Sequence, residues 1–376
     1  MGKLHLGILT FPLSKAGITP TSNLLKILNT LSNDITIITG DQGYKCFHED
    51  KRYGVHGIHH RRSTRVIPRI VNYIVTQIRI SLTMFRNTRH VDVWFFFIGG
   101  DCLLLPMLTA RFLRKKVVLM FPGSTTLVSK AINDGLADYA QCLSYINCIL
   151  SDKIILYSPR LISHWKLERF KEKIEIAHEH IMDVNNNNQT KPLCQRNPTI
   201  GFIGRFSREK GAFNFAESIP KILSANSNTT FVMIGEGELF EAFKKCLQKN
   251  GVYQRTTLLS WIPHHQVLRY LNECTLIVIP SVTEGLPNIM LEAISCGTPV
   301  LATPVGAIPD VISDGKTGFL LKDNSADCIS RTVERIVSRS DLEQIAHAAR
   351  IIIENEFTLP TASRRFKEII CNVICA

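Results

Sequence analysis

Apolar runs of strand length alternate with helix-length amphipathic segments along the whole chain, and this alternation constrains the fold more than any other feature. The runs are nearly continuous stretches of Val, Ile, Leu and Phe, as in VDVWFFFI (91–98) and LIVIP (276–280). Such runs are typical of parallel strands that helices cover on both faces. The sequence therefore predicts an α/β protein built on parallel sheets.

The same pattern predicts where the individual elements lie. The expected strands are 4–10, 34–39, 91–98, 116–121, 153–157, 173–177, 199–204, 229–235, 256–260, 275–280 and 299–303. The expected helices lie at or near 21–32, 67–86, 101–114, 127–150, 159–169, 210–225, 237–249, 264–272, 287–296 and 324–339.

A length of 376 residues favours two domains. Segment 183–198 is polar, contains four consecutive Asn and two Pro, and has the composition of a surface linker. We predict one Rossmann-like domain over residues 1–185 and a second over 190–355, with a C-terminal helix near 359–376 that can pack back on the first. Ligands bind such sheets outside the carboxyl ends of their strands, so two domains facing each other would form a binding cleft.

Composition narrows the class of protein. The hydrophobic fraction of 45% is enough to bury real cores, and a formal charge of +12 favours anionic partners such as nucleotides, nucleic acid or acidic lipid surfaces. Eleven cysteines without CxxC pairs or zinc-site spacing indicate reduced thiols and no metal site. The first residues, MGKLHLGILTF, lack the features of a signal peptide, so we expect a cytoplasmic protein.

Two glutamates, Glu284 and Glu292, are separated by seven residues in SVTEGLPNIMLEAISCGTPV. The first lies in a loop after an expected strand, and the second lies inside a helix expected to have Pro287 at its first position. Backbone N–H groups and the helix dipole between them favour a bound phosphate. A carboxylate inside that helix can accept hydrogen bonds from sugar hydroxyls. The pattern therefore predicts a site for a nucleoside diphosphate sugar.

Two cations follow another expected strand, which ends at Gly204. Arg205 and Lys210 lie in the loop before the next helix and could clamp a diphosphate, with charge-assisted hydrogen bonds of about 1.5–3 kcal/mol each. Either residue alone would be interpreted as a solvated charge in a loop. The two together, beside the glutamate motif, favour the diphosphate clamp.

GRFSREKG, followed downstream by segment 281–321, resembles the retaining GT-B glycosyltransferases of family four. The shared pattern comprises the strand-end Gly-Arg, the Lys-Gly, the two spaced glutamates and GTPV, and continues through VGAIPD (305–310) and DGKTGF (314–319). The resemblance covers nearly the whole second domain and is weaker in the first. It implies two Rossmann-like domains with parallel sheets facing across a cleft.

The resemblance also implies roles for single residues. Arg205 and Lys210 would neutralise the donor diphosphate, Glu284 would contact the transferred sugar, and Glu292 would hold the ribose hydroxyls. The other donor contacts implied by the motif are Gly17, Gly204, Trp261, Ile262, Gly285, Leu286, Pro287 and Asn288. The alternative interpretation of Gly17 is an ordinary turn glycine, and the alternative interpretation of Trp261 is a core residue.

The implied reaction is transfer of a hexose-like sugar, with retention, to a glycan, lipid-linked or small-molecule acceptor. The sequence has no metal-binding DxD triplet, so Lys and Arg would stabilise the departing diphosphate, and no cofactor is implied beyond the donor. The first domain departs from the family: Phe121-Pro122-Gly123-Ser124 stands where a His-Gly pair is usual. His178 and His180 could line the cleft, although histidines at a strand end are more often surface or structural residues.

The segment 59–90 is basic and carries apolar residues at helical spacing. It fits a helix lying on an anionic membrane surface, which would place the protein on the inner face of the membrane. It fits equally a Rossmann helix with one core face and one solvated face. No nucleic-acid recognition motif accompanies the charge, so no nucleic acid is expected.

Two other functions stay open at this point. One is a nucleotide-sugar epimerase or phosphorylase-like enzyme of the GT-B type, which would convert the donor without an acceptor. The other is a non-catalytic basic module that binds membranes or nucleic acid and has no affinity for nucleotide sugars.

Overall fold

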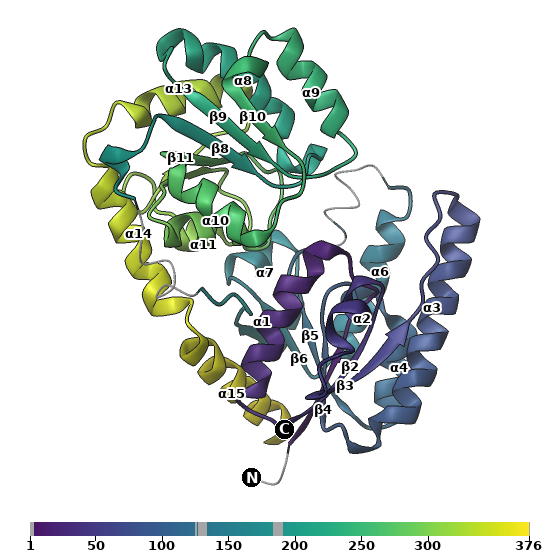
Figure 1. Cartoon of the computed structure of the whole chain (residues 1–376). Helices are drawn as coiled ribbons and strands as arrows, with labels where there is room; N and C mark the ends of the chain where they lie inside the picture. Colours follow the sequence, from purple (N-terminus) through teal and green to yellow (C-terminus); the bar gives the residue numbers. More distant parts are fainter. Residues whose placement is uncertain (1–3, 125, 127–133, 183–190, 376) are drawn as a thin grey trace. The chain divides into compact units, whose positions relative to one another are not determined.

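The computed structural model describes residues 4–124, 126, 134–182 and 191–375, which form two compact units. The first unit contains the described residues before 130, the segment Asp134–Ile181 and the chain from Leu359 onward. The second unit contains Met182 and residues 191–358. Each unit is a parallel sheet with helices packed on it (Figure 1). The predicted helix over 127–150 and the predicted linker 183–198 lie partly outside the described residues.

The first unit is built on a seven-stranded sheet of order β3-β2-β1-β4-β5-β6-β7, and all its strand pairs are parallel. Its strands are β1 His5–Leu9, β2 Asp34–Gly40, β3 Tyr53–Ile58, β4 Val93–Phe96, β5 Lys116–Met120, β6 Lys153–Leu156 and β7 Ile174–Ile176. Its helices are α1 Ile18–Asn29, α2 Gln42–Phe47, α3 Val66–Asn87, α4 Leu104–Phe112, α6 Ala137–Leu150, α7 Arg160–His164 and α15 Leu359–Cys375.

The last helix, α15, belongs to the first unit although it follows the second in sequence. Its apolar face buries Ala362, Phe366 and Ile370 in the core against β4 and β5, beside α1. The Phe366 ring lies 6.1 Å from that of Phe95 in β4. Burying such side chains contributes roughly 1.5–3 kcal/mol each, which fixes the chain end on this sheet.

The second unit is built on a six-stranded parallel sheet of order β10-β9-β8-β11-β12-β13. Its strands are β8 Thr199–Ile203, β9 Thr230–Ile234, β10 Thr256–Leu259, β11 Leu276–Ile279, β12 Val300–Ala302 and β13 Phe319–Leu320. Its helices are α8 Ala212–Ala225, α9 Phe240–Lys249, α10 His264–Glu273, α11 Asn288–Ser295, α12 Ile308–Val311, α13 Ala326–Val337 and α14 Leu342–Glu356.

The structure confirms the α/β class and every predicted strand, and it adds elements that the pattern missed. Strands β3 and β13 lie at sheet edges, where the run YGVHGI (53–58) is only half-buried and Phe319–Leu320 is two residues long. Helices α2, α12 and α14 were also missed. The helix predicted from residue 101 begins at Leu104, because Gly100–Cys102 forms a 3-10 turn.

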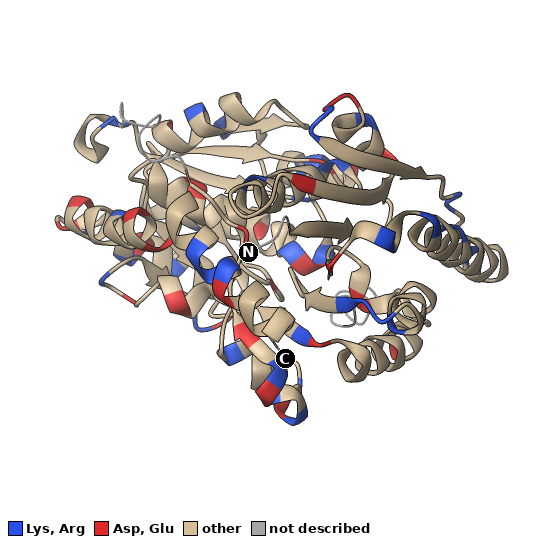
Figure 2. Cartoon of the chain, turned by 90° about the horizontal axis from the view of Figure 1, so that it is seen from below, with Lys and Arg blue, Asp and Glu red and all other residues tan. Residues whose placement is uncertain are grey.

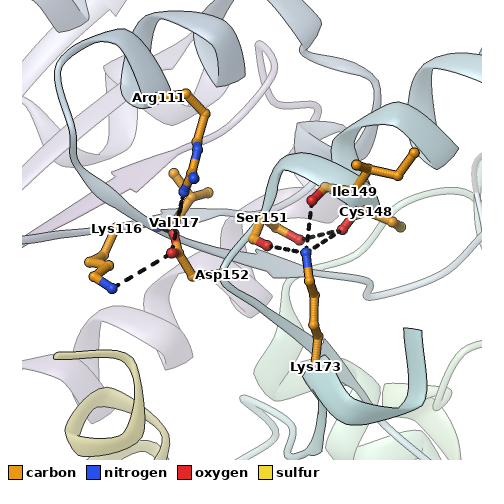
Figure 3. Close-up of polar contacts among 8 residues, drawn as sticks. All are labelled: Arg111, Lys116, Val117, Cys148, Ile149, Ser151, Asp152 and Lys173. Carbon is orange, nitrogen blue, oxygen red and sulfur yellow. Dashed lines mark hydrogen bonds and ion pairs between the residues drawn. The ribbon is translucent and has the colours of Figure 1, made fainter. Parts of the chain in front are cut away.

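Lys173 closes the carboxyl end of α6 (Figure 3). Its ammonium donates to the carbonyl oxygens of Ile149 at 2.7 Å and Ser151 at 2.8 Å, and lies 3.4 Å from that of Cys148. A cation at this position satisfies carbonyls that have no partner in the helix and interacts favourably with the helix dipole. The contact holds the turn between α6 and β6 in place.

A buried carboxyl follows β7. Glu179 is 2% exposed, and the hydroxyl of Tyr157 donates to its Oε2 at 2.5 Å. Burial raises the pKa of the Glu179 carboxyl to about 7. The rings of His178 and His180 are also buried, and burial holds the pKa of His178 well below its usual range. These two histidines are therefore core residues of the first unit.

We predict a pH-dependent difference in stability between wild type and Glu179→Gln. Because the folded pKa of about 7 lies above the ordinary value of 4.5, the protonated carboxyl stabilises the fold at low pH. That stability is present below pH 4.5 and is lost as the pH rises to about 7, by an amount on the order of 3 kcal/mol. Thermal unfolding from pH 4.5 to 7.5 should show wild type losing stability relative to Glu179→Gln.

The exposed substitution Glu172→Gln, seven residues upstream, is the matched control and should follow wild type at every pH. Parallel curves for wild type and Glu179→Gln would contradict a buried, neutral Glu179.

Candidate functional site

The candidate site lies in the second unit, where two neighbouring strands end. Strands β8 and β11 pair in parallel, with Leu276 opposite Ile200 and Ile277 opposite Gly201. Because they are parallel, their carboxyl ends lie at the same edge of the sheet. The loop over 204–211 follows β8 and the loop over 280–287 follows β11. The sheet therefore brings the two predicted motifs together, although Lys210 and Glu284 are 74 positions apart in the sequence.

The backbones of these two loops are in direct contact. The N–H of Val282 donates to the carbonyl of Glu209 at 2.8 Å. Gly211 has φ of +67°, and a Cβ at this position would lie 2.1 Å from the carbonyl oxygen of Pro280. Only glycine meets both conditions. The Lys-Gly pair of the motif thus combines the cation Lys210 with the glycine that allows close packing of the two loops.

Lys210 and Glu284 form an ion pair at this edge. The Lys210 ammonium lies 2.6 Å from Glu284 Oε1, and the Ser281 hydroxyl donates to the same oxygen at 2.7 Å. The two charged side chains are 22% and 9% exposed. Glu284 Oε2 accepts no hydrogen bond from the residues that the structure describes. One carboxylate oxygen and two ammonium N–H groups therefore stay available to a ligand.

Arg205 is held by a buried carboxylate. Its Nη2 lies 3.1 Å from Oε1 of Glu209, whose side chain is only 4% exposed, while the Arg205 side chain is 59% exposed. The other oxygen of Glu209 has no hydrogen-bond partner among the described residues. Glu209 thus holds one terminal nitrogen of the guanidinium, while most of the Arg205 side chain stays exposed.

Helix α11 begins directly after the Glu284 loop. Pro287 is its N-cap, with φ −73° and ψ 120°, and is not its first helical residue as the sequence suggested. No side chain caps this end and its first turn carries no acidic residue, so the turn is suited to an anion.

The loop after β12 packs on the Glu284 loop. Gly306, with φ of +61°, allows this close approach to the Glu284 and Gly285 carbonyls. The N–H of Ala307 donates to the Gly285 carbonyl at 2.8 Å.

Glu292, one turn inside α11, contacts a histidine that the sequence analysis did not select. Its Oε1 lies 3.1 Å from Nε2 of His264, the first residue of α10, and this hydrogen bond raises the pKa of the imidazole. The Glu292 side chain is 12% exposed. Trp261 and Ile262 precede His264, and Trp261 is 52% exposed, which argues against a core role for it.

The two glycines predicted to contact the donor, Gly204 and Gly17, lie in different units. Gly204 links β8 to Arg205, and its N–H donates to the Ile234 carbonyl at 2.9 Å. Gly17 lies in the first unit, at the end of the 3-10 turn Lys15–Gly17. Its φ of −81° is open to any residue, but a Cβ would lie 2.8 Å from the Leu13 side chain. Close packing explains glycine there without a ligand.

The structure therefore brings Lys210 and Glu284 into contact, places Arg205 in the same loop, and pairs Glu292 with His264. It adds Ser281 and Glu209, which sequence reasoning missed. Ser281 could have been found from its place directly after a strand at this edge. Among the described residues, no group of three or more His, Cys, Asp or Glu side chains is arranged to hold a metal ion.

Arg196 anchors α10 and α11 from behind the site. It is 7% exposed, and burial lowers the pKa of its guanidinium. Its five contacts, at 2.6–3.4 Å, are all to neutral oxygens, those of Lys191, Asn272, Cys274, Cys296 and Thr298. Cys274 and Cys296 are the C-caps of α10 and α11, so one cation serves the carboxyl ends of both helices.

Comparison with known families agrees with this geometry. Residues 183–352 match the model for glycosyl transferases group 1. An alpha-maltose-1-phosphate synthase of Mycolicibacterium smegmatis is 36% identical over 35% of this chain and 34% of that protein. The amylovoran biosynthesis glycosyltransferase AmsK of Erwinia amylovora is 23% identical over 69% of this chain and 65% of that protein. The matches thus span less than two thirds of these relatives.

Solved structures show the fold of the whole chain. HepE of Anabaena, crystallised in complex with UDP-glucose, is similar with a TM-score of 0.76 and 15% identity, covering 98% of this chain and 100% of that one. Sucrose-phosphate synthase of Thermosynechococcus elongatus has a TM-score of 0.75 and 13% identity, covering 99% of both chains. The two units therefore have the Rossmann-like folds of GT-B glycosyltransferases.

We predict that Arg196→Met lowers the free energy of unfolding of the second unit by about 3–5 kcal/mol. The change leaves several buried carbonyl and hydroxyl oxygens without a donor. Chemical denaturation followed by circular dichroism measures the loss. Arg255→Met is the matched control, because exposed Arg255 donates to one carbonyl, that of Ser227, and should change stability by less than about 0.5 kcal/mol. Equal stability of the two variants would contradict the anchoring role.

Proposed function

We propose that this protein is a retaining, metal-independent glycosyltransferase. It would transfer a sugar from a nucleoside diphosphate sugar to a glycan, a lipid-linked acceptor or a small molecule. The observation that carries the proposal is the Lys210–Glu284 pair at the shared carboxyl edge of β8 and β11. That edge is where ligands of parallel α/β sheets bind.

The Lys210–Glu284 pair offers complementary groups to the two parts of a sugar diphosphate. The ammonium is held by one contact and keeps two N–H donors for phosphate oxygens. The carboxylate keeps Oε2 for a hydroxyl of the transferred sugar. Both side chains are at most 22% exposed, so their interactions with a ligand are screened less than those of surface charges.

The remaining groups extend the same site. Arg205 would bind the diphosphate with its outward donors, and the N-terminus of α11 around Gly285, Leu286 and Asn288 would complete the phosphate cradle. Glu292 would accept hydrogen bonds from the ribose hydroxyls, with His264 fixing one of its oxygens. Trp261 and Ile262, just before α10, would contact the base.

In the reaction, negative charge develops on the leaving diphosphate as the bond to the anomeric carbon breaks. Lys210 and Arg205 would stabilise that charge without a metal ion. Glu284 would orient the sugar and need not attack it. The acceptor hydroxyl would then enter on the face that the diphosphate leaves, with its proton passing to the departing phosphate, which gives retention.

The relatives support the donor class. HepE is described in complex with UDP, with UDP and glucose, and with UDP-glucose. AmsK is named for the biosynthesis of a polysaccharide. By analogy, the donor here would be a nucleoside diphosphate sugar and the product part of a polysaccharide or glycolipid. A cytoplasmic place of action follows from the nucleotide sugar substrate.

We expect Lys210→Ala to weaken binding of the matching nucleoside diphosphate sugar by about 10- to 100-fold, the loss of one charge-assisted contact of about 1.5–3 kcal/mol. Glu292→Ala should weaken it in the same way by removing the ribose acceptor. A panel of donors is first screened by thermal shift, since a bound donor stabilises the fold. Calorimetry and a transfer assay then compare the variants with wild type.

Lys249→Ala, on α9 and exposed, is the control for loss of one positive charge and should bind like wild type. Wild-type donor affinity and turnover in both Lys210→Ala and Glu292→Ala would reject the assignment. Conversion of the donor to an epimer without an acceptor would identify an epimerase instead. No affinity for any nucleotide sugar would identify a binding module.

A further inference from the structure

Helix α3 carries an exposed apolar stripe on the first unit. Six large side chains, each 44–75% exposed, recur at spacings of three and four residues: Ile67, Val71, Ile74, Ile78, Leu82 and Phe85. At ~3.6 residues per turn they fall within about 80° of one another around the helix. The stripe therefore runs along one side of the helix for most of its 22 residues.

This stripe is not the face that packs on the sheet. The buried residues of α3 are Thr76, Gln77, Ile80 and Met84, which lie on a different side of the helix. The sequence analysis left open a membrane helix and an ordinary Rossmann helix with one core face and one solvated face. The structure shows a buried face and a separate exposed apolar stripe. Packing within the fold does not account for the exposed stripe.

Helix α4 widens the apolar surface. α3 and α4 lie side by side (Figure 1). Between them lies an open groove of about 410 Å³, lined by Ile78, Ser81, Leu82, Phe85, Leu105, Leu108, Thr109 and Phe112. Phe112 is 80% exposed and Leu108 45%. We call the stripe and this groove the α3–α4 surface; an exposed apolar area of this kind marks an interaction site.

Positive charge is in excess in the segment that carries the α3–α4 surface. Segment 51–133 contains fourteen Lys and Arg but only two acidic residues, Asp92 and Asp101, and Asp101 is 5% exposed. Figure 2 shows the cartoon with Lys and Arg in blue and Asp and Glu in red. Some of these cations form ion pairs with carboxylates outside the segment. Asp152 pairs with Arg111 and Lys116 (Figure 3), and Arg52, Arg62 and Arg69 pair with Asp50, Asp41 and Asp134.

Other cations of this segment have no carboxylate partner among the described residues. Arg61, Arg65, Arg86 and Arg114 are exposed and form no ion pair with any residue that the structure describes. Arg65 is the N-cap of α3, and Arg86 lies in its last turn. The apolar stripe is therefore bordered by positive charge at both ends.

We propose that the α3–α4 surface docks on an anionic lipid surface. The apolar stripe would enter the boundary between headgroups and acyl chains, and the arginines would pair with lipid phosphates. This is a peripheral contact, because no helix among the described residues is long and apolar enough to cross a membrane.

The positive charge around the α3–α4 surface favours a lipid surface over the other partners that could cover it. A second copy of the chain would place the same arginines against each other, and this repulsion disfavours a symmetric dimer through this surface. A folded protein partner would need an acidic rim matched to a long, convex helix face. An anionic membrane supplies both an apolar layer and phosphates along the whole stripe. The inference does not depend on the donor site, which lies in the other unit.

The test is co-sedimentation of the full chain with vesicles of phosphatidylcholine, with and without phosphatidylglycerol. We expect binding to the anionic vesicles that weakens with salt. Replacing the three exposed arginines in R61Q/R65Q/R86Q should reduce partitioning at low salt by about 100-fold, from about 1 kcal/mol for each cation. The triple variant I67S/I74S/F85S should reduce it by at least about tenfold.

The matched controls replace exposed residues elsewhere, in I351S/I374S and K26Q/K245Q/K249Q, and should bind like wild type. All variants change surface side chains, so their thermal midpoints and their donor affinity by calorimetry should stay at wild-type values. Vesicle binding that the controls reduce as much as the test variants would overturn the proposal. So would absence of binding to anionic vesicles, or a dimer in sedimentation velocity that I67S/I74S/F85S abolishes.

Discussion

The parallel pairing of β8 with β11 is the constraint on which the candidate site depends. It puts the carboxyl ends of two strands side by side, so that loops from distant parts of the sequence meet at one edge. The contact between Val282 and Glu209, and the close approach of Gly211 to Pro280, then leave little freedom in how the loops meet. Lys210 and Glu284 pair at 2.6 Å as a consequence of that backbone geometry.

Electrostatics decides what this edge can bind. Each carboxylate of the site already has one oxygen held by a neighbour: Glu284 by Lys210 and Ser281, and Glu292 by His264. These contacts fix the side chains before a ligand arrives, which lowers the entropy lost on binding. Arg196 contributes from the opposite ends of α10 and α11, where it binds the carbonyls that end both helices. The helices α10 and α11 are therefore held at the site by the contact between His264 and Glu292, and at their opposite ends by Arg196.

Much of this could be predicted from local patterns, and the failures have physical causes. Continuously apolar strands such as Val93–Phe96 are recognisable because parallel sheets bury both of their faces. Edge strand β3 escapes because half-exposed residues need not be apolar. In the site, motif residues such as Lys210 and Glu284 carry a spacing signal, whereas Glu209 and His264 matter through tertiary contacts that no spacing encodes. Likewise, helical periodicity showed that α3 is amphipathic but did not show that its buried face and its exposed apolar stripe lie on different sides.

The most direct test of the central claim is a crystal structure of the chain with a bound nucleoside diphosphate. The account predicts phosphate oxygens within hydrogen-bonding distance of Lys210 and Arg205, at the N-terminus of α11, with the ribose on Glu292. A nucleotide bound elsewhere, with Lys210 and Glu292 turned toward solvent and away from it, would contradict the account.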